Sequence, residues 1–301
     1  MNRYIITGVT SFLGSNLAKC LIADGNMVWG IVRPDSKNTS AISSIERLNV
    51  VRVDLDAYDV DSLYGELIKH GISEIDGWIH FSWDGMGSEG RSNPEIQERN
   101  IVNAKKAYNV AERLNARRFV FSGSQAEYGN GSKDKPDPQS MYGKAKLKFG
   151  QWASSRISQM EFVHLRIYSV YGPGDHPNSL VNSCIRTFVK NEDMVLGPCT
   201  QLWNYMDIRD CSKAIAMIAE REEKTEGTYE IASATGKRLS EYVEDIWKIC
   251  GTNGRCLFGM RDNNAEGAAD LIADISGLKQ IGFKERYSFE EGVRNIINSG
   301  I

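Results

Sequence analysis

Short runs of β-branched and aromatic residues alternate with helical patterns over the first two-thirds of this 301-residue chain. This alternation is typical of a parallel sheet whose strands are joined by crossover helices. Such crossovers are right-handed, and they predict an α/β fold with a doubly wound parallel sheet. In a sheet of this kind, ligands bind at the carboxyl ends of the strands.

The pattern predicts a Rossmann-like domain followed by a smaller lobe. We expect the Rossmann-like domain over residues 1–172, with returning segments near 203–232, and a mainly substrate-binding lobe over residues 173–301. Strands are expected at 4–7, 27–32, 50–53, 77–81, 118–122 and 162–166, and helices at 14–23, 60–70 and 100–115. In the less regular remainder, helices are expected at 179–190, 240–250 and 290–297, a short segment at 194–197, and returning strands at 205–208 and 228–231.

The turn after the first strand predicts a phosphate site. Gly8 and Gly14 flank it, and a helix follows. Glycine lets the backbone approach a pyrophosphate, whose charge then lies against the free amides of the helix N-terminus. The middle position, where a glycine is expected, is Ser11. Serine is small enough to be tolerated, with a slight shift of the pyrophosphate. The sequence therefore predicts a dinucleotide cofactor.

The end of the second strand indicates which dinucleotide binds. An NAD enzyme places a carboxylate there for the ribose hydroxyls, whereas this chain has Val32 followed by Arg33. Arginine pairs bidentately with phosphate, and Ser36 or Lys37 would assist. We therefore expect NADP(H) in preference to NAD(H). Asp54, at the end of the third strand, is expected either to receive the adenine amino group or to cap a turn.

A candidate catalytic group follows the fifth strand. Residues 122–129 contain two serines, Ser122 and Ser124, and Tyr142 and Lys146 stand four residues apart on an expected helix. Reduction of a ketone needs a proton donor at the oxygen, and a cation on the same helix face helps a phenol to act as one. A serine would orient the oxygen. Such a pair in isolation usually marks a solvated helix face, so the interpretation depends on the glycine turn as well.

Charge and cysteine content exclude several other classes. The net charge of −3 gives no support for a nucleic-acid or anionic-membrane partner, and apolar runs stay below the roughly 18 residues of a membrane span. A strand is expected almost at the N-terminus, which leaves no room for a signal peptide. The six cysteines are scattered, without metal-like spacing, as expected of reduced thiols in a cytoplasmic protein.

Taken together, these motifs resemble the extended short-chain dehydrogenase/reductase family, which comprises nucleotide-sugar epimerases, dehydratases and reductases. The resemblance covers nearly the whole chain. It is carried by Thr7-Gly8, Gly14, Asp54-Leu55, residues 80–83, Asn100, residues 122–129, Tyr142, Lys146, residues 165–173, 273–276, 281–283 and 288–292.

The resemblance implies roles for individual residues. Tyr142 is implied as the acid/base, with Lys146 tuning it and holding the nicotinamide ribose. Ser124 is implied to bind the reacting oxygen; it is preferred over Ser122 because it stands four residues before Tyr128. The implied cofactor-binding set is Gly8, Thr10, Ser11, Phe12, Leu13, Gly14, Arg33, Asp54, Leu55, Phe81, Ser82, Trp83, Asn100, Ser122, Tyr142, Lys146 and Tyr168. Family members often form homodimers through the helices that carry Asn100 and Tyr142.

Departures from the family pattern narrow the reaction. Dehydratases place an Asp-Glu pair after the catalytic hydroxyl, where this chain has Gln125-Ala126. Many epimerases have an arginine for the nucleotide diphosphate where this chain has Trp203, and the usual asparagine is replaced by Ser169. The chain is most similar to the subgroup that reduces nucleotide-activated 4-keto-6-deoxyhexoses, such as the enzymes that make CDP-abequose.

The substrate diphosphate then needs another cation. Arg186 and Arg261 are the candidates, although each is also typical of a surface charge, and Trp203 is expected either to stack on the substrate or to pack in the core. The predicted substrate-binding residues are Ser124, Ser169, Ser179, Leu180, Arg186, Trp203 and Arg261. No catalytic role is expected for the four histidines.

Three functions remain open. The leading prediction is NADPH-dependent reduction of the 4-keto group of a nucleotide-linked 4-keto-6-deoxyhexose, with Tyr142 as proton donor. The alternative is a nucleotide-sugar 4-epimerase with tightly bound NAD(P), which uses the same residues. A non-catalytic NADP-sensing protein is the third, and it is disfavoured because Ser124, Tyr142 and Lys146 are all present.

Overall fold

The computed structural model describes residues 1–261 and 272–300. The chain forms two compact units. The first combines residues Met1–Ile167 with Ser212–Tyr229, and the second combines Tyr168–Cys211 with Glu230–Ile301. The chain thus leaves the first unit after its sixth strand and returns to it for most of one helix and most of one strand.

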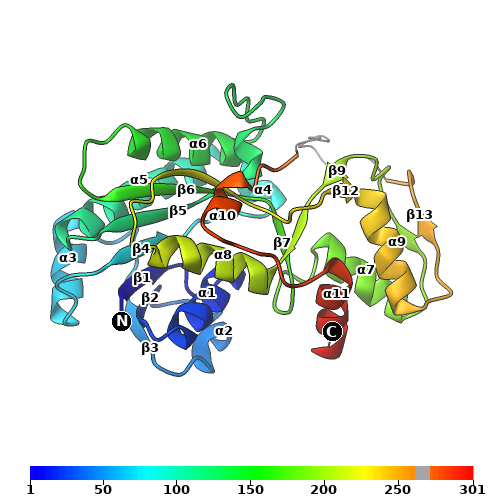
Figure 1. Cartoon of the computed structure of the whole chain (residues 1–301), viewed down its shortest axis with the longest axis horizontal. Coiled ribbons are helices and arrows are strands. Elements are labelled where there is room, and N and C mark those ends of the chain that lie inside the picture. The colour runs from blue at the N-terminus through cyan, green and yellow to red at the C-terminus, as the bar shows by residue number, and fades with distance from the viewer. Residues whose placement is uncertain (262–271, 301) are drawn as a thin grey trace. The chain divides into compact units, whose positions relative to one another are not determined.

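A seven-stranded sheet forms the centre of the first unit, in the order β11-β6-β5-β4-β1-β2-β3 (Figure 1). Neighbouring strands from β1 to β6 are parallel. The doubly wound α/β fold is therefore confirmed, and the strand order reverses between β1 and β4. The strands are β1 (Arg3–Thr7), β2 (Met27–Val32), β3 (Leu48–Arg52), β4 (Gly77–His80), β5 (Arg118–Ser124), β6 (Glu161–Ile167) and β11 (Gly227–Ile231).

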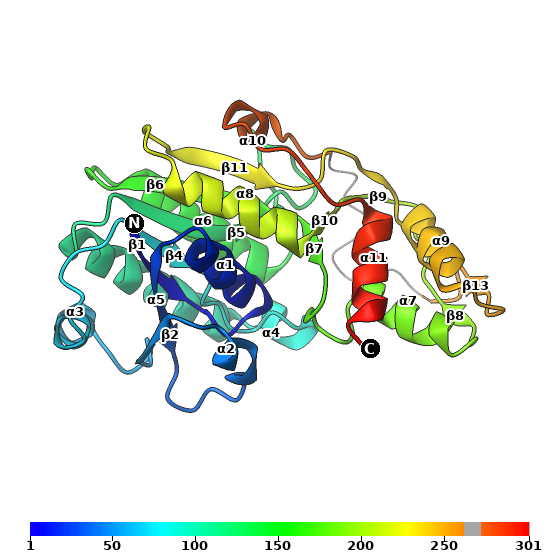
Figure 2. The ribbon, with the colours of Figure 1, turned by 60° about the horizontal axis from the view of Figure 1, so that its bottom comes forward.

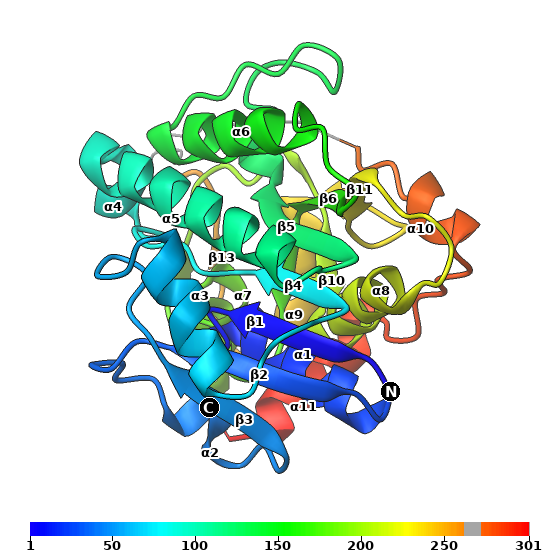
Figure 3. The ribbon, with the colours of Figure 1, turned by 90° about the vertical axis from the view of Figure 1, so that its left-hand side faces the viewer.

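Helices cover both faces of this sheet (Figure 3). One face carries α3 (Val60–Lys69), α5 (Pro94–Arg113) and α6 (Met141–Ser154), and the other carries α1 (Phe12–Ala23) and α8 (Ile208–Glu220). The short elements of this unit are α2 (Ser40–Ser43), α4 (Ser88–Ser92) and the 3₁₀ turn η1 (Gln125–Glu127). Helix α5 begins earlier than expected because the side chain of Asn93 caps it and Pro94 occupies its first position.

An aromatic core fixes α5 and α6 on the sheet. Phe121 of β5 packs against Phe149 of α6 with ring centroids 4.5 Å apart, and Tyr108 of α5 packs against Phe119 at 5.2 Å. These side chains are fully or almost fully buried, and each such burial contributes about 1.5–3 kcal/mol. This packing sets the position of α6, which carries Tyr142 and Lys146.

In the described residues, the second unit is built from short strands, three helices that pack together and one further short helix. Its helices are α7 (Leu180–Val189), α9 (Leu239–Cys250), α10 (Ser276–Gln280) and α11 (Phe289–Asn298), and its strands are β7 (Ser169–Tyr171), β8 (Met194–Val195), β9 (Leu202–Trp203), β10 (Tyr205–Asp207), β12 (Lys237–Arg238) and β13 (Cys256–Leu257). Helices α7, α9 and α11 lie together (Figure 2) and enclose a core that includes Phe188, Val243 and Val293.

Two features in this region differ from the sequence-based expectation. The strand expected at 205–208 pairs with β7 in a two-stranded sheet instead of returning to the main sheet, whereas β11 does return as an edge strand. Helix α8 was not anticipated, although Ile208, Cys211 and Ile215 have the spacing of a helix face. Within residues 1–261 and 272–300, the structure has no helix of the length and apolar character that a membrane span requires.

Candidate cofactor and active site

The turn after β1 forms a backbone cradle that only glycine fits. Gly8 has φ = +72°, and a Cβ atom on it would lie 2.8 Å from backbone atoms of Phe81 and Ser82, which follow β4. A Cβ on Gly14 would overlap the carbonyl oxygen of Gly8. The cradle therefore lies where the strand order reverses, which is the ligand position in a sheet of this type. Its open backbone fits the pyrophosphate of a dinucleotide.

Ser11 has a specific role in this turn. It is the N-cap of α1, and its Oγ accepts a hydrogen bond from the Gly14 backbone amide at 3.1 Å. The serine at the expected glycine position thus binds one of the amides that a helix N-terminus leaves free. Phe12, Leu13 and Gly14 follow in the first turn of the helix.

A cleft of about 530 Å³ extends from the cradle along the ends of β2, β3 and β4. This volume lies in the usual range for small-molecule sites. Many of the predicted cofactor residues line it, namely Gly8, Thr10, Ser11, Arg33, Asp54, Leu55, Phe81, Ser82, Trp83 and Asn100. Asp54 also caps a turn, because its Oδ1 accepts from the Asp56 amide at 2.9 Å.

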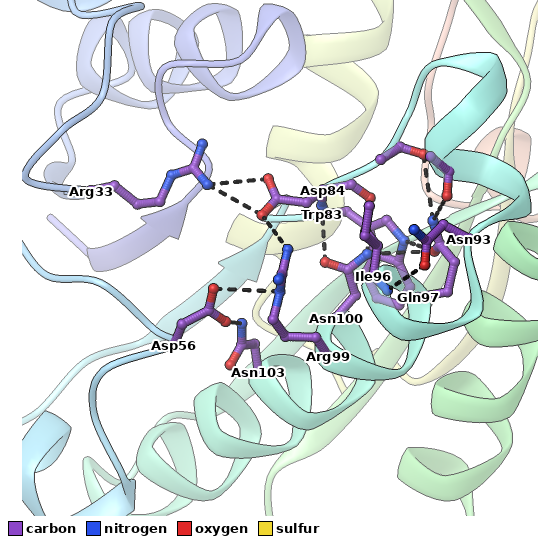
Figure 4. Close-up of polar contacts among 12 residues, drawn as sticks. Arg33, Asp56, Trp83, Asp84, Asn93, Ile96, Gln97, Arg99, Asn100 and Asn103 are labelled. Carbon is purple, nitrogen blue, oxygen red and sulfur yellow. Dashed lines mark hydrogen bonds and ion pairs between the residues drawn. The ribbon is translucent and has the colours of Figure 1, made fainter.

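One wall of the cleft contains an ion-pair network (Figure 4). Nη1 of Arg33 contacts both carboxylate oxygens of Asp84, at 3.2 and 3.4 Å. Arg99 approaches the same carboxylate at 3.7 Å and Asp56 at 3.4 Å. Asp56 also accepts a hydrogen bond from Asn103. Arg33 follows a recognisable strand end and could be predicted, whereas Asp84, Arg99 and Asp56 belong to no motif and could not.

Asn100 and Gln97 hold the loop that follows β4 (Figure 4). The Asn100 side chain accepts from the Asp84 amide and donates to the Asp84 carbonyl, both at 2.9 Å. Gln97 accepts from the indole Nε1 of Trp83 at 2.8 Å. Helix α5 thereby fixes the backbone of Asp84 and the ring of Trp83 on the cleft wall.

Lys146 is buried beside Ser122. Its Nζ donates to the carbonyl oxygen of Ser122 and, at 3.2 Å, to the Ser122 hydroxyl. The ammonium lies 3.9 Å from the ring centroid of Trp83 and 4.8 Å from that of Phe121. Burial lowers the pKa of Lys146 to about 7; nearby Glu127 opposes this shift and Arg91 adds to it. Favourable contact with aromatic faces is available only to the charged form.

Tyr142 lies in the first turn of α6, next to the same groups. Ser140 caps the helix by accepting from the Gly143 amide. The Arg91 guanidinium lies 4.2 Å from the Tyr142 ring centroid, and Lys146 Nζ lies 5.6 Å from it. The phenol ring thus lies close to two cations. Sequence reasoning identified Lys146 but not Arg91, because the loop and short helix that carry it have no recognisable motif.

Ser122 and Ser124 have different surroundings. The Ser122 hydroxyl donates to the His80 carbonyl at 3.0 Å and meets Lys146. The Ser124 hydroxyl accepts from the Ala126 amide, and the Ser124 amide donates to buried Glu127 at 2.8 Å. Burial by itself would raise the pKa of Glu127, but His164 and Arg166 bring it below the usual value. Glu127 therefore remains charged and anchors the Ser124 turn.

His80 has a structural position. Its Nδ1 lies 2.8 Å from the Thr7 hydroxyl, across the junction of β1 and β4. Complete burial lowers the pKa of His80 to about 3, so the ring is neutral near pH 7.

The remaining predicted residues belong to the second unit. The Tyr168 hydroxyl donates to Glu230 at 3.1 Å, and Ser179 caps α7. Trp203, in β9, has an indole nitrogen that is buried without a hydrogen-bond partner in the part of the chain that is described. The other four lie in β7 (Ser169), in α7 (Leu180 and Arg186) and after β13 (Arg261).

Comparison with known proteins places this chain in a family. Residues 4–232 match the model of the NAD dependent epimerase/dehydratase family. A CDP-abequose synthase of Salmonella muenchen is 24% identical over 98% of this chain and 97% of its own length. A UDP-glucose 4-epimerase of Neisseria meningitidis is 25% identical over 94% and 93% of the two chains. The crystal structure of UDP-glucose 4-epimerase from Thermotoga maritima superposes with a TM-score of 0.86 at 18% identity, over 98% of this chain and 97% of that one.

The chain therefore belongs to the NAD dependent epimerase/dehydratase family. It is an NAD(P)-dependent enzyme, either an oxidoreductase or an epimerase. The predicted family and the prediction of an enzyme are confirmed.

Proposed function

We propose that this enzyme reduces the 4-keto group of a nucleotide-activated 4-keto-6-deoxyhexose with NADPH, and that Tyr142 donates the proton. The observation that carries the proposal is the placement of Tyr142 and buried Lys146 in the same unit as the glycine cradle. The first unit would hold the cofactor, and the second unit would bind most of the substrate.

Tyr142 is suited to protonate a developing alkoxide. Loss of its proton leaves a phenolate, and the Arg91 guanidinium and the Lys146 ammonium beside the ring favour that negative charge. Ser124, at the end of β5, would hydrogen-bond the substrate oxygen and orient it. A dinucleotide bound at the cradle would supply the hydride.

The residues of the cleft fit a dinucleotide with a 2′-phosphate. The cradle at Gly8 and Gly14 would accept the pyrophosphate, and Arg33, at the end of β2, would pair with the 2′-phosphate. The Arg33 side chain is 55% exposed and its ion pair with Asp84 is solvated, so the guanidinium is available to another anion at low cost.

Net reduction is favoured over dehydration and epimerisation by particular residues. Gln125 and Ala126 follow Ser124 and provide neither an acid nor a base for loss of water. Arg33 favours a cofactor drawn from the NADPH pool, whereas an epimerase keeps its dinucleotide bound. The CDP-abequose synthase relative supports a deoxysugar substrate. A nucleotide-sugar 4-epimerase is the second candidate, supported by the UDP-glucose 4-epimerase relative.

We also propose a cytoplasmic homodimer formed through α5 and α6.

The test follows nicotinamide absorbance with purified protein, NADPH and a panel of dTDP-, CDP-, GDP- and UDP-linked 4-keto-6-deoxyhexoses. Oxidation of NADPH with one of them, reduced by a factor of about 10² or more in Tyr142→Phe while NADPH binding is retained, is expected. Absence of oxidation with every member of the panel, together with interconversion of ordinary nucleotide hexoses, would refute the reductase and support the epimerase.

A further inference from the structure

Two loops that line the cofactor cleft are joined by an ion pair. Arg33 follows β2 and Asp84 lies in the loop after β4, and the guanidinium contacts both oxygens of the carboxylate (Figure 4). Arg33 is also the residue that would bind a 2′-phosphate. A phosphate that recruits Arg33 must therefore compete with the Asp84 carboxylate for it.

We propose that Asp84 sets the selectivity of this cleft between a 2′-phosphate and a 2′-hydroxyl. The inference rests on the dinucleotide site proposed above. A 2′-phosphate carries nearly two negative charges, so it is disfavoured by a neighbouring carboxylate and by the loss of the Arg33–Asp84 contact. A neutral ribose hydroxyl lacks this repulsion and gains a hydrogen-bond acceptor in Asp84.

Because both side chains of the pair are exposed, a phosphate can replace Asp84 as the partner of Arg33 at low cost. The side chains of Arg33 and Asp84 are 55% and 41% exposed. Solvated ion pairs of this kind are weak, so Asp84 modulates the affinity for the phosphate and does not prevent its binding. We expect an effect of about two- to fivefold on the dissociation constant.

Arg99 gives Asp84 a second partner. Its Nη2 lies 3.7 Å from the Asp84 carboxylate and its Nε lies 3.4 Å from Asp56. When Arg33 turns to a phosphate, Arg99 remains to neutralise Asp84. Arg99 is therefore a positioning residue, and its contribution to phosphate binding should depend on the presence of the Asp84 carboxylate.

The loop itself is held independently of the carboxylate. The Asp84 amide and carbonyl bond to the Asn100 side chain, so Asp84→Asn removes the charge and leaves the backbone anchored. Asp35 offers a matched control, since it lines the same cleft and Asp35→Asn leaves the Arg33–Asp84 contact intact.

The experiment measures dissociation constants by calorimetry at low salt for NADP⁺, NAD⁺, 2′,5′-ADP and 5′-AMP. For Asp84→Asn, the ratio of the NAD⁺ constant to the NADP⁺ constant should rise about two- to fivefold above wild type, and more than for Asp35→Asn. The same shift should appear between 5′-AMP and 2′,5′-ADP. Arg99→Met should weaken NADP⁺ binding in wild type but leave it unchanged in the Asp84→Asn background.

An unchanged ratio in Asp84→Asn, or an equal rise in Asp35→Asn, would overturn the inference. A failure of the proposed function would give a different result in this experiment. If wild-type protein binds NAD⁺ more tightly than NADP⁺, the NADPH preference is wrong, whereas the change of ratio in Asp84→Asn still decides the role of Asp84. If wild-type protein binds none of the four compounds, both proposals are wrong.

Discussion

Lys146 lies in a nearly closed environment. Two aromatic faces and the oxygens of Ser122 surround its ammonium, and its exposed fraction is 2%. Burial lowers the pKa of Lys146 to about 7, against the opposing effect of Glu127. In its protonated form, Lys146 lies next to Tyr142 and is suited to stabilise a phenolate.

The lowered pKa predicts a pH-dependent contribution of Lys146 to stability. Between about pH 7 and 10, the unfolded chain keeps a proton on this lysine that the folded protein has released. The free energy of unfolding of wild type, minus that of Lys146→Met, should therefore rise with pH by up to about 1.4 kcal/mol per unit. Urea unfolding at about pH 7, 8 and 9 measures this difference. The control is Lys148→Met, because Lys148 is exposed. A difference for Lys146→Met that does not change with pH would contradict the buried position of Lys146.

At the scale of single residues, only part of the candidate site could be predicted from the sequence. Tyr142, Lys146 and Arg33 were identified because they occupy recognisable motif positions. Asp84, Arg91 and Arg99 reach the cleft or the phenol from the loop, short helix and long helix after β4. Arg33 and Tyr142, which Asp84 and Arg91 contact, each lie 51 residues away in the chain, and Asp56, which Arg99 contacts, lies 43 residues away. No local pattern encodes pairings of that kind.

At the scale of elements, the strand–turn–helix at residues 3–23 depends on close packing of two glycines. Its position could be predicted because glycine placement and strand and helix periodicity agree there. The capping role of Ser11 could not, because a serine at that point is compatible both with a cap and with a tolerated replacement of glycine.

Gly14→Ala tests this packing. The added methyl group would overlap the Gly8 carbonyl oxygen and lie 2.8 Å from Val9 Cα. We expect a loss of about 1–3 kcal/mol in the free energy of unfolding and weaker dinucleotide binding. Gly65→Ala in α3 is the control, since a Cβ there meets nothing within 4 Å, and it should stabilise the protein by about 0.5–1 kcal/mol. Equal effects of the two substitutions would show that the cradle is not tightly packed.

The second unit was the least predictable group of elements. Its strands have two or three residues each, too few for an alternating pattern to be recognised. The segment 205–208 has the composition of a strand, and its choice of β7 as partner depends on tertiary contacts. Helix α8, by contrast, has a clear apolar face and could have been found from its spacing.

At the scale of the whole molecule, the chain passes through the second unit for 44 residues, Tyr168–Cys211, and then returns to the first unit. Arg118 binds the segment that returns to the first unit, Ser212–Tyr229. It is fully buried, pairs with Glu161 at 2.6 Å, and donates to the carbonyls of Ile218 and Ala219 at the end of α8. It also donates to the carbonyls of Arg221 and Glu223.

Arg118→Met should therefore destabilise the protein by about 3–5 kcal/mol, because it leaves a carboxylate and several carbonyl groups without their buried partner. Arg294→Met, which breaks an exposed pair four residues apart on α11, should change stability by less than about 0.5 kcal/mol. Thermal and denaturant unfolding measure both. A similarly small effect of Arg118→Met would mean that the returning segment is held by other contacts.

Net reduction at a sugar carbonyl is the reaction proposed for Tyr142 and the cofactor cleft. The most direct measurement supplies NADPH deuterated at the transferred position with the active 4-keto sugar and analyses the product by mass spectrometry and NMR. Net reduction should give one deuterium on C4 of each product molecule, one NADPH consumed per product, and almost no product with Tyr142→Phe. A product that carries no label and forms without consumption of NADPH would contradict it.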